Sequence, residues 1–164
     1  MSELVIRPAR RHELQRVGEI TVAAYRADGF IDPGANYERL LADAARRAEH
    51  AELLVAVDAD GVVLGTVTIA LPGTEFAEVC MDGELEFRML ATDPVARGRG
   101  VGEALTRAVL DRARERGCAR VVMCSAEAMT TAHRLYHRIG FHRIPERDWE
   151  PLPDFRLRAF AVEL

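Results

Sequence analysis

The sequence has no long apolar run, few cysteines and no surplus of basic residues, and each absence removes a class of protein. No apolar stretch approaches the roughly 18 residues that a membrane-spanning helix needs, so we expect no membrane partner. The formal net charge is −4, whereas a general nucleic-acid binder would normally show a basic surplus. We therefore expect neither a membrane nor a nucleic acid as partner.

The three cysteines, Cys80, Cys118 and Cys124, are scattered and show no paired spacing. Such a set suggests neither a disulfide framework nor a metal-binding motif. The N-terminal residues MSELVIRPARR also lack the apolar segment of a secretory signal peptide. These observations predict reduced thiols, no metal site and a cytoplasmic location.

What the sequence does have is the composition of an ordinary globular protein, with 49% hydrophobic and 29% charged residues. A chain of 164 residues is long enough for one domain with a real core, so we predict a single domain over residues 1–164. Period-two and helical patterns are mixed along the chain. They predict helices at 11–25, 36–48, 100–116 and 129–139, and strands at 4–6, 53–57, 62–71, 120–125, 141–144 and 155–162, with a polar loop at 145–153. This mixture indicates an α/β or α+β fold with one mixed sheet.

The chain is organised around residues 84–102. The first part alternates as a strand does, with Leu85, Phe87 and Met89 on one side and the charged Glu84, Glu86 and Arg88 on the other. A turn at Asp93-Pro94 leads into Arg97-Gly98-Arg99-Gly100-Val101-Gly102, and an amphipathic helix follows at once. The order is therefore strand, glycine- and arginine-rich turn, helix.

Such a turn is suited to binding an anion. The first N–H groups of a helix are unpaired and lie at the positive end of its dipole, and glycine lets a ligand approach the backbone closely. A dinucleotide fingerprint fails because Glu103 stands where a third glycine is needed, and the Gly-Lys-Ser/Thr of a P-loop is absent. Arginine–glycine segments that bind RNA are longer and disordered. Alone, the turn would be only a structural connection about as often as a phosphate cradle.

Two motifs in order make the second interpretation specific. The turn resembles the pyrophosphate signature Arg/Gln-x-x-Gly-x-Gly/Ala of the GNAT superfamily of acyl-CoA-dependent N-acetyltransferases, through Arg97, Gly100 and Gly102. Residues 132–141, AHRLYHRIGF, are similar to its later Ala-x-x-Leu-Tyr-x-x-x-Gly-Phe element. The resemblance implies a central mixed, mostly antiparallel sheet flanked by about four helices. It also implies acetyl-CoA as the acyl donor, with the pyrophosphate at Arg97, Gly98, Arg99, Gly100, Val101 and Gly102, and pantetheine along the strand edge Met89, Leu90 and Ala91.

The same resemblance points to two catalytic side chains. Transfer to an amine needs a neutral nucleophile, hence a base, and family members often place a base glutamate on the central strand. Glu84 and Glu86 share one face there, and we favour Glu86; the alternative is that both are solvent-facing. Tyr136, in the later motif, is the family's usual acid toward the departing thiolate, although a tyrosine at helical spacing is more often core.

The sequence thus predicts an N-acetyltransferase that moves an acetyl group from acetyl-CoA to a primary amine by direct attack. A non-catalytic acyl-CoA-binding module and a transferase of another acyl group are the alternatives. The acceptor, a small molecule or a protein amine, stays open, as does a homodimer. Of the other residues, Cys124 is expected to be inert, His133 and His137 to lack a third metal ligand, and Trp149, Tyr25 and Phe30 to be either acceptor contacts or packing residues.

Overall fold

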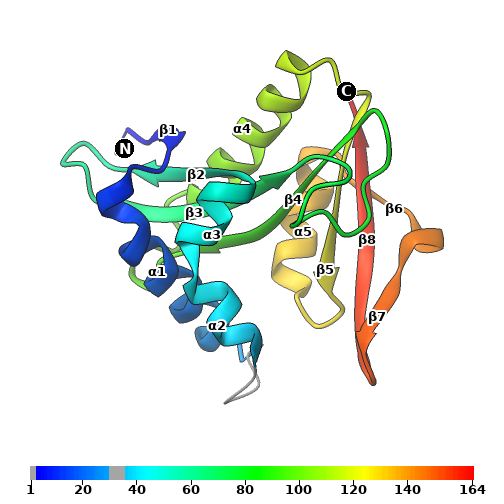
Figure 1. Ribbon diagram of the computed structural model, residues 1–164, viewed down its shortest axis with the longest axis horizontal. Helices are drawn as coiled ribbons and strands as arrows, with labels where there is room; N and C mark the ends of the chain where they lie inside the picture. The colour runs from blue at the N-terminus through cyan, green and yellow to red at the C-terminus, as the bar shows by residue number, and fades with distance from the viewer. Residues whose placement is uncertain (1–2, 30–35) are drawn as a thin grey trace. The chain divides into compact units, whose positions relative to one another are not determined.

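The fold is described from a computed structural model, which describes residues 3–29 and 36–164 (Figure 1). Residues 1–69 with 89–108, and residues 70–88 with 109–164, form two compact units, called here the first and the second unit. The helices are α1 (Leu14–Ala27), α2 (Asn36–Ala42), α3 (Ala44–His50), α4 (Val101–Glu115) and α5 (Thr130–Ile139). The strands are β1 (Val5–Pro8), β2 (Glu52–Val57), β3 (Val63–Ala70), β4 (Glu84–Thr92), β5 (Arg120–Ala126), β6 (His142–Arg143), β7 (Trp149–Leu152) and β8 (Phe155–Glu163).

The strands form one mixed sheet in the order β1-β2-β3-β4-β5-β8-β6, with β7 also paired to β8. The β4–β5 pair is parallel, and the pairs β1–β2, β2–β3, β5–β8, β6–β8 and β7–β8 are antiparallel. The predicted mixed, mostly antiparallel sheet is therefore confirmed. A mixed α/β fold with five α-helices in the described residues also agrees with the prediction of about four, because one expected helix is divided in two.

That division occurs at Asp43. The apolar stripe of residues 36–48 predicts one continuous helix, but Asp43 leaves the helical conformation at φ −87° and ψ 70°. Its carboxylate accepts a hydrogen bond from the Arg46 N–H at 3.1 Å and so caps α3. An aspartate competes with helical backbone bonding in this way, which explains why two short helices replace one.

The core of the first unit lies between its helices and strands. Apolar residues of α1 and α3 pack with residues of β2, β3 and β4, namely Val17, Ile20, Ala24, Ala44, Leu53, Val55, Val57, Val63 and Ala91. On β3, Gly65 brings the start of α4 very close. A Cβ at that glycine would lie 2.6 Å from the side chain of Val101 and 2.9 Å from the carbonyl oxygen of Ala91. Because residue 65 has no side chain, α4 begins against bare backbone.

The second unit has different side chains on the two faces of its sheet. One face carries a buried cluster of Val122, Ile144, Ala159 and Ala161, with Val79, Cys80 and Cys124 packed against it. An aromatic cluster forms elsewhere in this unit, where Tyr136 of α5 contacts Phe87, Phe141 and Phe160 at ring-centroid distances of 6.0, 5.7 and 6.0 Å. Since neighbouring residues of a strand point to opposite faces, Phe87 and Glu86 lie on opposite sides of β4.

Residues 145–153, for which the sequence predicts a polar loop, form a 3-10 turn at Pro145–Arg147 and then β7. Asp148 organises this segment. Its carboxylate accepts two bonds from the Arg143 guanidinium, at 2.8 and 2.6 Å, and one from the Ala159 N–H at 2.8 Å. β7 pairs antiparallel with β8, and a local pattern of polar side chains within residues 145–153 could not reveal that pairing.

No helix within residues 3–29 and 36–164 is long and apolar enough to cross a membrane. Phe30, an expected acceptor contact, lies outside the described residues.

Candidate active site

The glycine- and arginine-rich turn lies in the first unit, between β4 and α4. Asp93 opens it by accepting a hydrogen bond from the Val95 N–H at 3.2 Å, and a 3-10 turn follows at Pro94–Ala96. Gly98 and Gly100 then take positive φ angles of 81° and 76°, a region in which an L side chain is strained. The chain turns at residues 97–100, and α4 begins at Val101.

The turn is open on the side where these glycines lack a side chain. Among the described residues, no heavy atom lies within 4 Å of the position that a Cβ would occupy at Gly98 or at Gly100, chain neighbours aside. The first N–H groups of α4 have no partner within the helix by its geometry. An anion can therefore come close to backbone donors at the positive end of a helix of 15 residues.

The strand that leads into this turn has one unusual residue. Met89 is a non-glycine residue with a φ of 55°, and it is 4% exposed. A left-handed residue within a strand costs on the order of 1–3 kcal/mol, and such residues occur most often at functional sites. The pairing of β4 with β5 ends at Glu86–Val122, so Met89, Leu90 and Ala91 all come after the last pair. This is where the expected pantetheine-binding edge lies.

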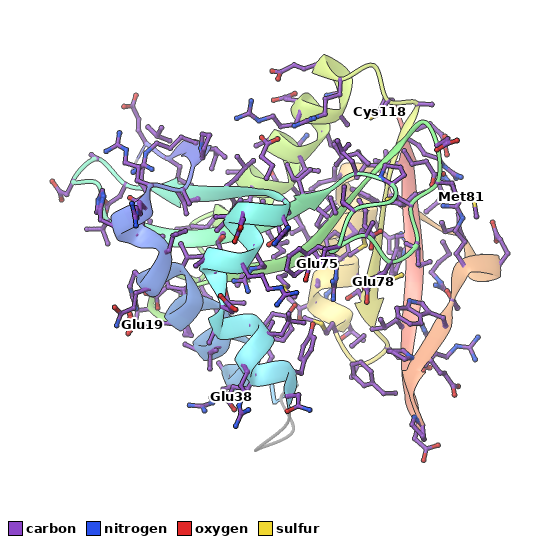
Figure 2. The ribbon with its side chains drawn as sticks, in the orientation of Figure 1. Glu19, Glu38, Glu75, Glu78, Met81 and Cys118 are labelled. Carbon is purple, nitrogen blue, oxygen red and sulfur yellow. The ribbon has the colours of Figure 1, made fainter. Side chains whose placement is uncertain are left out.

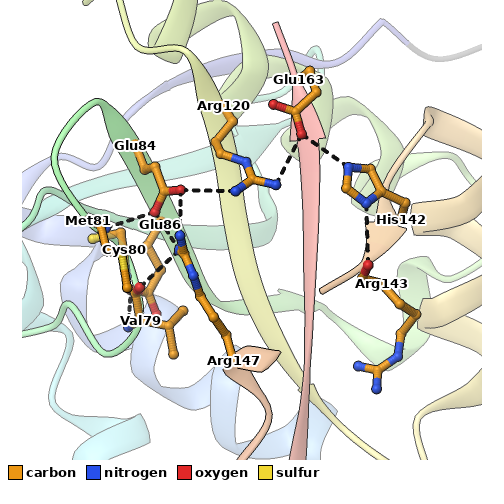
Figure 3. Close-up of polar contacts among 10 residues, drawn as sticks. All are labelled: Val79, Cys80, Met81, Glu84, Glu86, Arg120, His142, Arg143, Arg147 and Glu163. Atoms are coloured by element: carbon orange, nitrogen blue, oxygen red, sulfur yellow. Dashed lines mark hydrogen bonds and ion pairs between the residues drawn. The ribbon is translucent and has the colours of Figure 1, made fainter. Parts of the chain in front are cut away.

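Glu86 is the most deeply buried carboxylate of the second unit, with no exposed surface. Its Oε1 accepts hydrogen bonds from the N–H groups of Glu78, Val79 and Cys80 at 2.8, 2.9 and 3.1 Å. Figure 3 draws Glu86 with Val79 and Cys80. Its Oε2 is buried and has no hydrogen-bond partner among the described residues. One oxygen of this carboxylate thus holds a loop in place, while the other makes no hydrogen bond to the described residues.

Glu84, two residues earlier on the same face, is bonded through both carboxylate oxygens. Its carboxylate bonds both terminal nitrogens of Arg147, at 2.5 and 3.0 Å, accepts the Met81 N–H at 2.8 Å and lies 3.4 Å from Arg120 (Figure 3). Burial alone would raise its pKa, but Arg147, the Met81 N–H and Arg120 together hold that pKa below the usual value. Glu84 therefore remains ionised as one member of an ion-pair network.

The network continues across the sheet. Arg120 also contacts Glu163 at 3.1 Å, and the same carboxylate oxygen lies 3.1 Å from Nε2 of His142 (Figure 3). It joins β4, β5, β8 and β6 with the turn that holds Arg147. Glu84 is therefore part of an ion-pair network, whereas Glu86 is the carboxylate of β4 that has an oxygen without a hydrogen-bond partner among the described residues.

Glu78, in the loop before β4 (Figure 2), was not singled out by the sequence. Burial raises its pKa, the charge of Arg88 opposes that rise, and the charge of Glu86 adds to it. Its Oε1 lies 3.0 Å from Nε of Arg88. A second carboxylate therefore lies next to Glu86, placed there by a loop whose pattern carried no signal.

The two cysteines near Glu86 lie in surroundings that disfavour the thiolate form. Burial, with the charge of Glu86 as the next cause, raises the pKa of Cys80 and that of Cys124 to about 12. A raised pKa keeps both thiols protonated at neutral pH, whereas a reactive cysteine needs a lowered pKa that yields the thiolate. The expectation of an inert Cys124 agrees with this environment.

Tyr136 is 4% exposed, and its ring belongs to the aromatic cluster of the second unit. Burial raises the pKa of its phenol above the usual value, so the hydroxyl keeps its proton at neutral pH. Within the described residues, that hydroxyl makes no hydrogen bond, and the contacts of Tyr136 are ring contacts. The phenol therefore has a proton to donate and no hydrogen-bond acceptor among the described residues. A general acid toward a thiolate needs such a free proton.

The remaining candidates have structural surroundings. His133 and His137 both lie against Phe160, at 5.0 and 5.9 Å between ring centres, and burial lowers the pKa of His133. No group of three or more potential metal ligands occurs within residues 3–29 and 36–164.

Tyr25 contacts Tyr37 edge-to-face at 6.1 Å. The indole nitrogen of Trp149 is buried and has no hydrogen-bond partner in the described part of the chain.

Comparison with known proteins gives the class to which this arrangement belongs. The sequence model of the acetyltransferase (GNAT) family matches residues 14–141, and the chain belongs to that family. A mycothiol acetyltransferase of Salinispora tropica is 39% identical over 129 residues, which is 73% of this chain and 40% of that protein. An N-acetylaspartate synthetase of Danio rerio is 33% identical over 72 residues, 44% of this chain and 26% of that protein. The chain thus spans well under half the length of these curated relatives.

Solved structures agree on the fold. A GNAT-family acetyltransferase of Staphylococcus aureus Mu50 superposes with a TM-score of 0.76 at 14% identity, covering 99% of both chains. YncA of Salmonella typhimurium, solved with its cofactor acetyl-CoA, gives 0.68 at 23% identity and covers 99% of this chain and 95% of its own. At these identities the likeness establishes the GNAT fold, and the reaction has to be argued from the residues.

Proposed function

We propose that this chain is an N-acetyltransferase that moves an acetyl group from acetyl-CoA to a primary amine by direct attack, with residues 1–164 acting as one catalytic domain in the cytoplasm. The observation that carries the proposal is the pair of carboxylates on β4, of which Glu84 is fully bonded and Glu86 keeps one buried oxygen without a partner. A protein that only bound the donor would not need such an oxygen.

Donor binding is assigned to the first unit. Backbone N–H groups of residues 97–102, with their open glycines, are suited to the pyrophosphate. The edge of Met89, Leu90 and Ala91 offers backbone groups to the amides of pantetheine. Acetyl-CoA supplies the acetyl group as a thioester. The relatives named mycothiol acetyltransferase and N-acetylaspartate synthetase favour acetyl over longer acyl groups.

Proton management is assigned to the second unit. Alkyl ammonium groups have a pKa near 10.4, so at neutral pH almost none is nucleophilic. Glu86 attracts the ammonium form and accepts its proton. The amine lone pair forms the C–N bond while the C–S bond breaks, and the electron pair moves to sulfur. Tyr136 donates its proton to that sulfur, directly or through water, and is reprotonated by solvent. The acylated nitrogen loses its second proton to solvent and becomes the neutral amide, and Glu86 releases the first proton to solvent, so the products are the acetylamide and CoA with a free thiol.

Glu86 and Tyr136 lie on opposite faces of the sheet, because Tyr136 packs on Phe87. They can serve one reaction centre only where the sheet is open. The last residue pair of β4 and β5 is Glu86–Val122, and the proposal places the reaction centre beyond this pair.

The test is a panel of amines, including amino acids, small amines and peptides, incubated with acetyl-CoA and assayed with a thiol reagent for released CoA. Amine-dependent release with formation of the acetylamide supports the proposal. Binding of acetyl-CoA without release for any amine would instead identify a sensor module. Release from a longer acyl-CoA alone would identify a different acyltransferase.

A further inference from the structure

The Arg97 side chain is engaged by α1. Its Nη1 and Nη2 lie 2.8 and 3.1 Å from the two carboxylate oxygens of Asp28, and Nη2 also donates to the carbonyl oxygen of Ala24 at 3.3 Å. This is a bidentate ion pair, which fixes the relative orientation of the guanidinium and the carboxylate in addition to neutralising their charges. It also places a cation at the negative C-terminal end of a 14-residue helix.

A second ion pair joins α1 to the turn, with the positive charge on the helix and the negative charge on the turn. The Arg16 guanidinium, near the start of α1, bonds the carboxylate of Asp93. Asp93 is held by its backbone as well, because its N–H donates to the carbonyl oxygen of Leu64 at 2.8 Å. In one pair the arginine belongs to the helix and in the other to the turn. The segment 93–97 is thereby fixed to α1 at both ends.

We propose that Asp28 and Arg16 are positioning residues of the donor site, and that their pairs with Arg97 and Asp93 act as a clamp that sets the direction of the N–H groups of residues 98–102. The inference rests on the proposed function, since it takes the turn to be the pyrophosphate site. The proposal assigns Arg97 a different role. Its side chain holds the turn in place by pairing with α1, and the backbone N–H groups bind the pyrophosphate.

The alternative, in which Arg97 binds phosphate directly, makes the opposite prediction for Asp28. If the clamp operates, removing either partner of the pair lets the turn relax, so Asp28→Asn and Arg97→Ala weaken CoA binding to a similar extent. If Arg97 is a phosphate ligand, Asp28→Asn frees its guanidinium and leaves CoA affinity unchanged or increased.

The experiment is a double-mutant cycle with CoA as the titrant in calorimetry. Because Arg97 and Asp28 are 43% and 33% exposed, we expect each single variant to lose about two- to fivefold in affinity. The double variant should be no weaker than the weaker single variant, and Asp28→Glu should restore most of the loss. In turnover assays the donor KM should rise while kcat at saturating donor stays unchanged.

The matched control is Glu38→Gln. It removes the ion pair between Glu38 of α2 and Arg26 of α1, the helix to which Arg16 belongs (Glu38 is labelled in Figure 2). It should leave the CoA affinity at the wild-type value. The clamp would be overturned if Arg97→Ala lost affinity and Asp28→Asn did not. It would also be overturned if neither variant lost affinity, and in both cases the acetyltransferase proposal would stand. A wild-type chain that binds no CoA would overturn both.

Discussion

The base assignment can be tested by changing Glu86 to Gln. The substitution removes the charge but keeps a carbonyl oxygen, which can still accept the three N–H groups of residues 78–80. The new amide nitrogen takes the place of Oε2, where the described residues offer no partner. The loop should therefore keep its position, and the chemical step alone should lose its proton acceptor.

The size of both effects follows from these contacts. An unsatisfied buried donor costs about 1–3 kcal/mol of unfolding free energy, which corresponds to roughly 2–4 °C in Tm for each kcal/mol in a chain of this size. Loss of a general base costs about 10²–10⁴-fold in turnover. The stability loss is small enough to leave the variant folded at 25 °C, so the turnover loss can be measured.

Glu84→Gln is the matched control, because it neutralises a carboxylate on the same strand face. It breaks the pairing with Arg147, a side chain only 15% exposed, and should lower Tm at least as much as Glu86→Gln does. Its turnover should stay within a few-fold of wild type. Both variants are assayed by CoA release across pH and by thermal unfolding, with the amine found in the panel.

Glu86→Gln should recover turnover as pH rises toward the amine pKa of about 10.4, since solvent can then deprotonate the nucleophile. Equal Tm losses with wild-type turnover in Glu86→Gln would show that Glu86 only holds the loop. Loss of turnover in Glu84→Gln instead would mean that the wrong carboxylate was chosen.

Three further outcomes are expected. Tyr136→Phe should lower turnover by at least about tenfold with unchanged CoA affinity and little change in Tm, because its hydroxyl bonds no described group; a large Tm loss with normal turnover would mean that the residue is only core. Gly100→Val should abolish CoA binding in calorimetry, whereas Gly61→Val, at a similar φ of 79° and with equally open surroundings, should carry the same strain and still bind CoA. Glu13→Gln should flatten the acid dependence of stability: the Arg7 guanidinium holds the Glu13 pKa at about 2 against a usual 4.5, so its contribution is present above pH 4.5 and is lost as pH falls toward 2. Urea midpoints at pH 7, 4 and 3 measure this, and parallel curves for variant and wild type would contradict it.

Much of the fold followed from the sequence because its signals are local. The period-two pattern at 84–92, the apolar stripe that begins at Val101 and the glycine at position 140 all determine structure over a few residues. The turn was predicted for the same reason, since Asp93-Pro94 and the two positive-φ glycines act within one short segment.

The remainder depends on specific polar contacts that no helical or strand periodicity marks. The Arg143–Asp148–Ala159 contacts hold the residue that precedes β7, and the Arg147–Glu84 pair, which spans 63 positions, removes one carboxylate from consideration. Glu78 becomes relevant only because its backbone N–H reaches Glu86. The pairing of Arg97 with Asp28 spans 69 positions, and no pattern of spacing marks it.

The missing side chain at residue 65 has a consequence for how this protein can change over evolutionary time. Position 65 lies in β3, some way along the chain from the turn, and yet a methyl group there would meet Val101, the first residue of α4. The direction of the helix axis, and hence the place where an anion is received, depends on a hydrogen atom in another strand. Random substitution should therefore find position 65 as intolerant as the glycines of the turn, because a smaller residue at 101 would relieve the contact with that side chain but not the 2.9 Å contact with the Ala91 carbonyl oxygen.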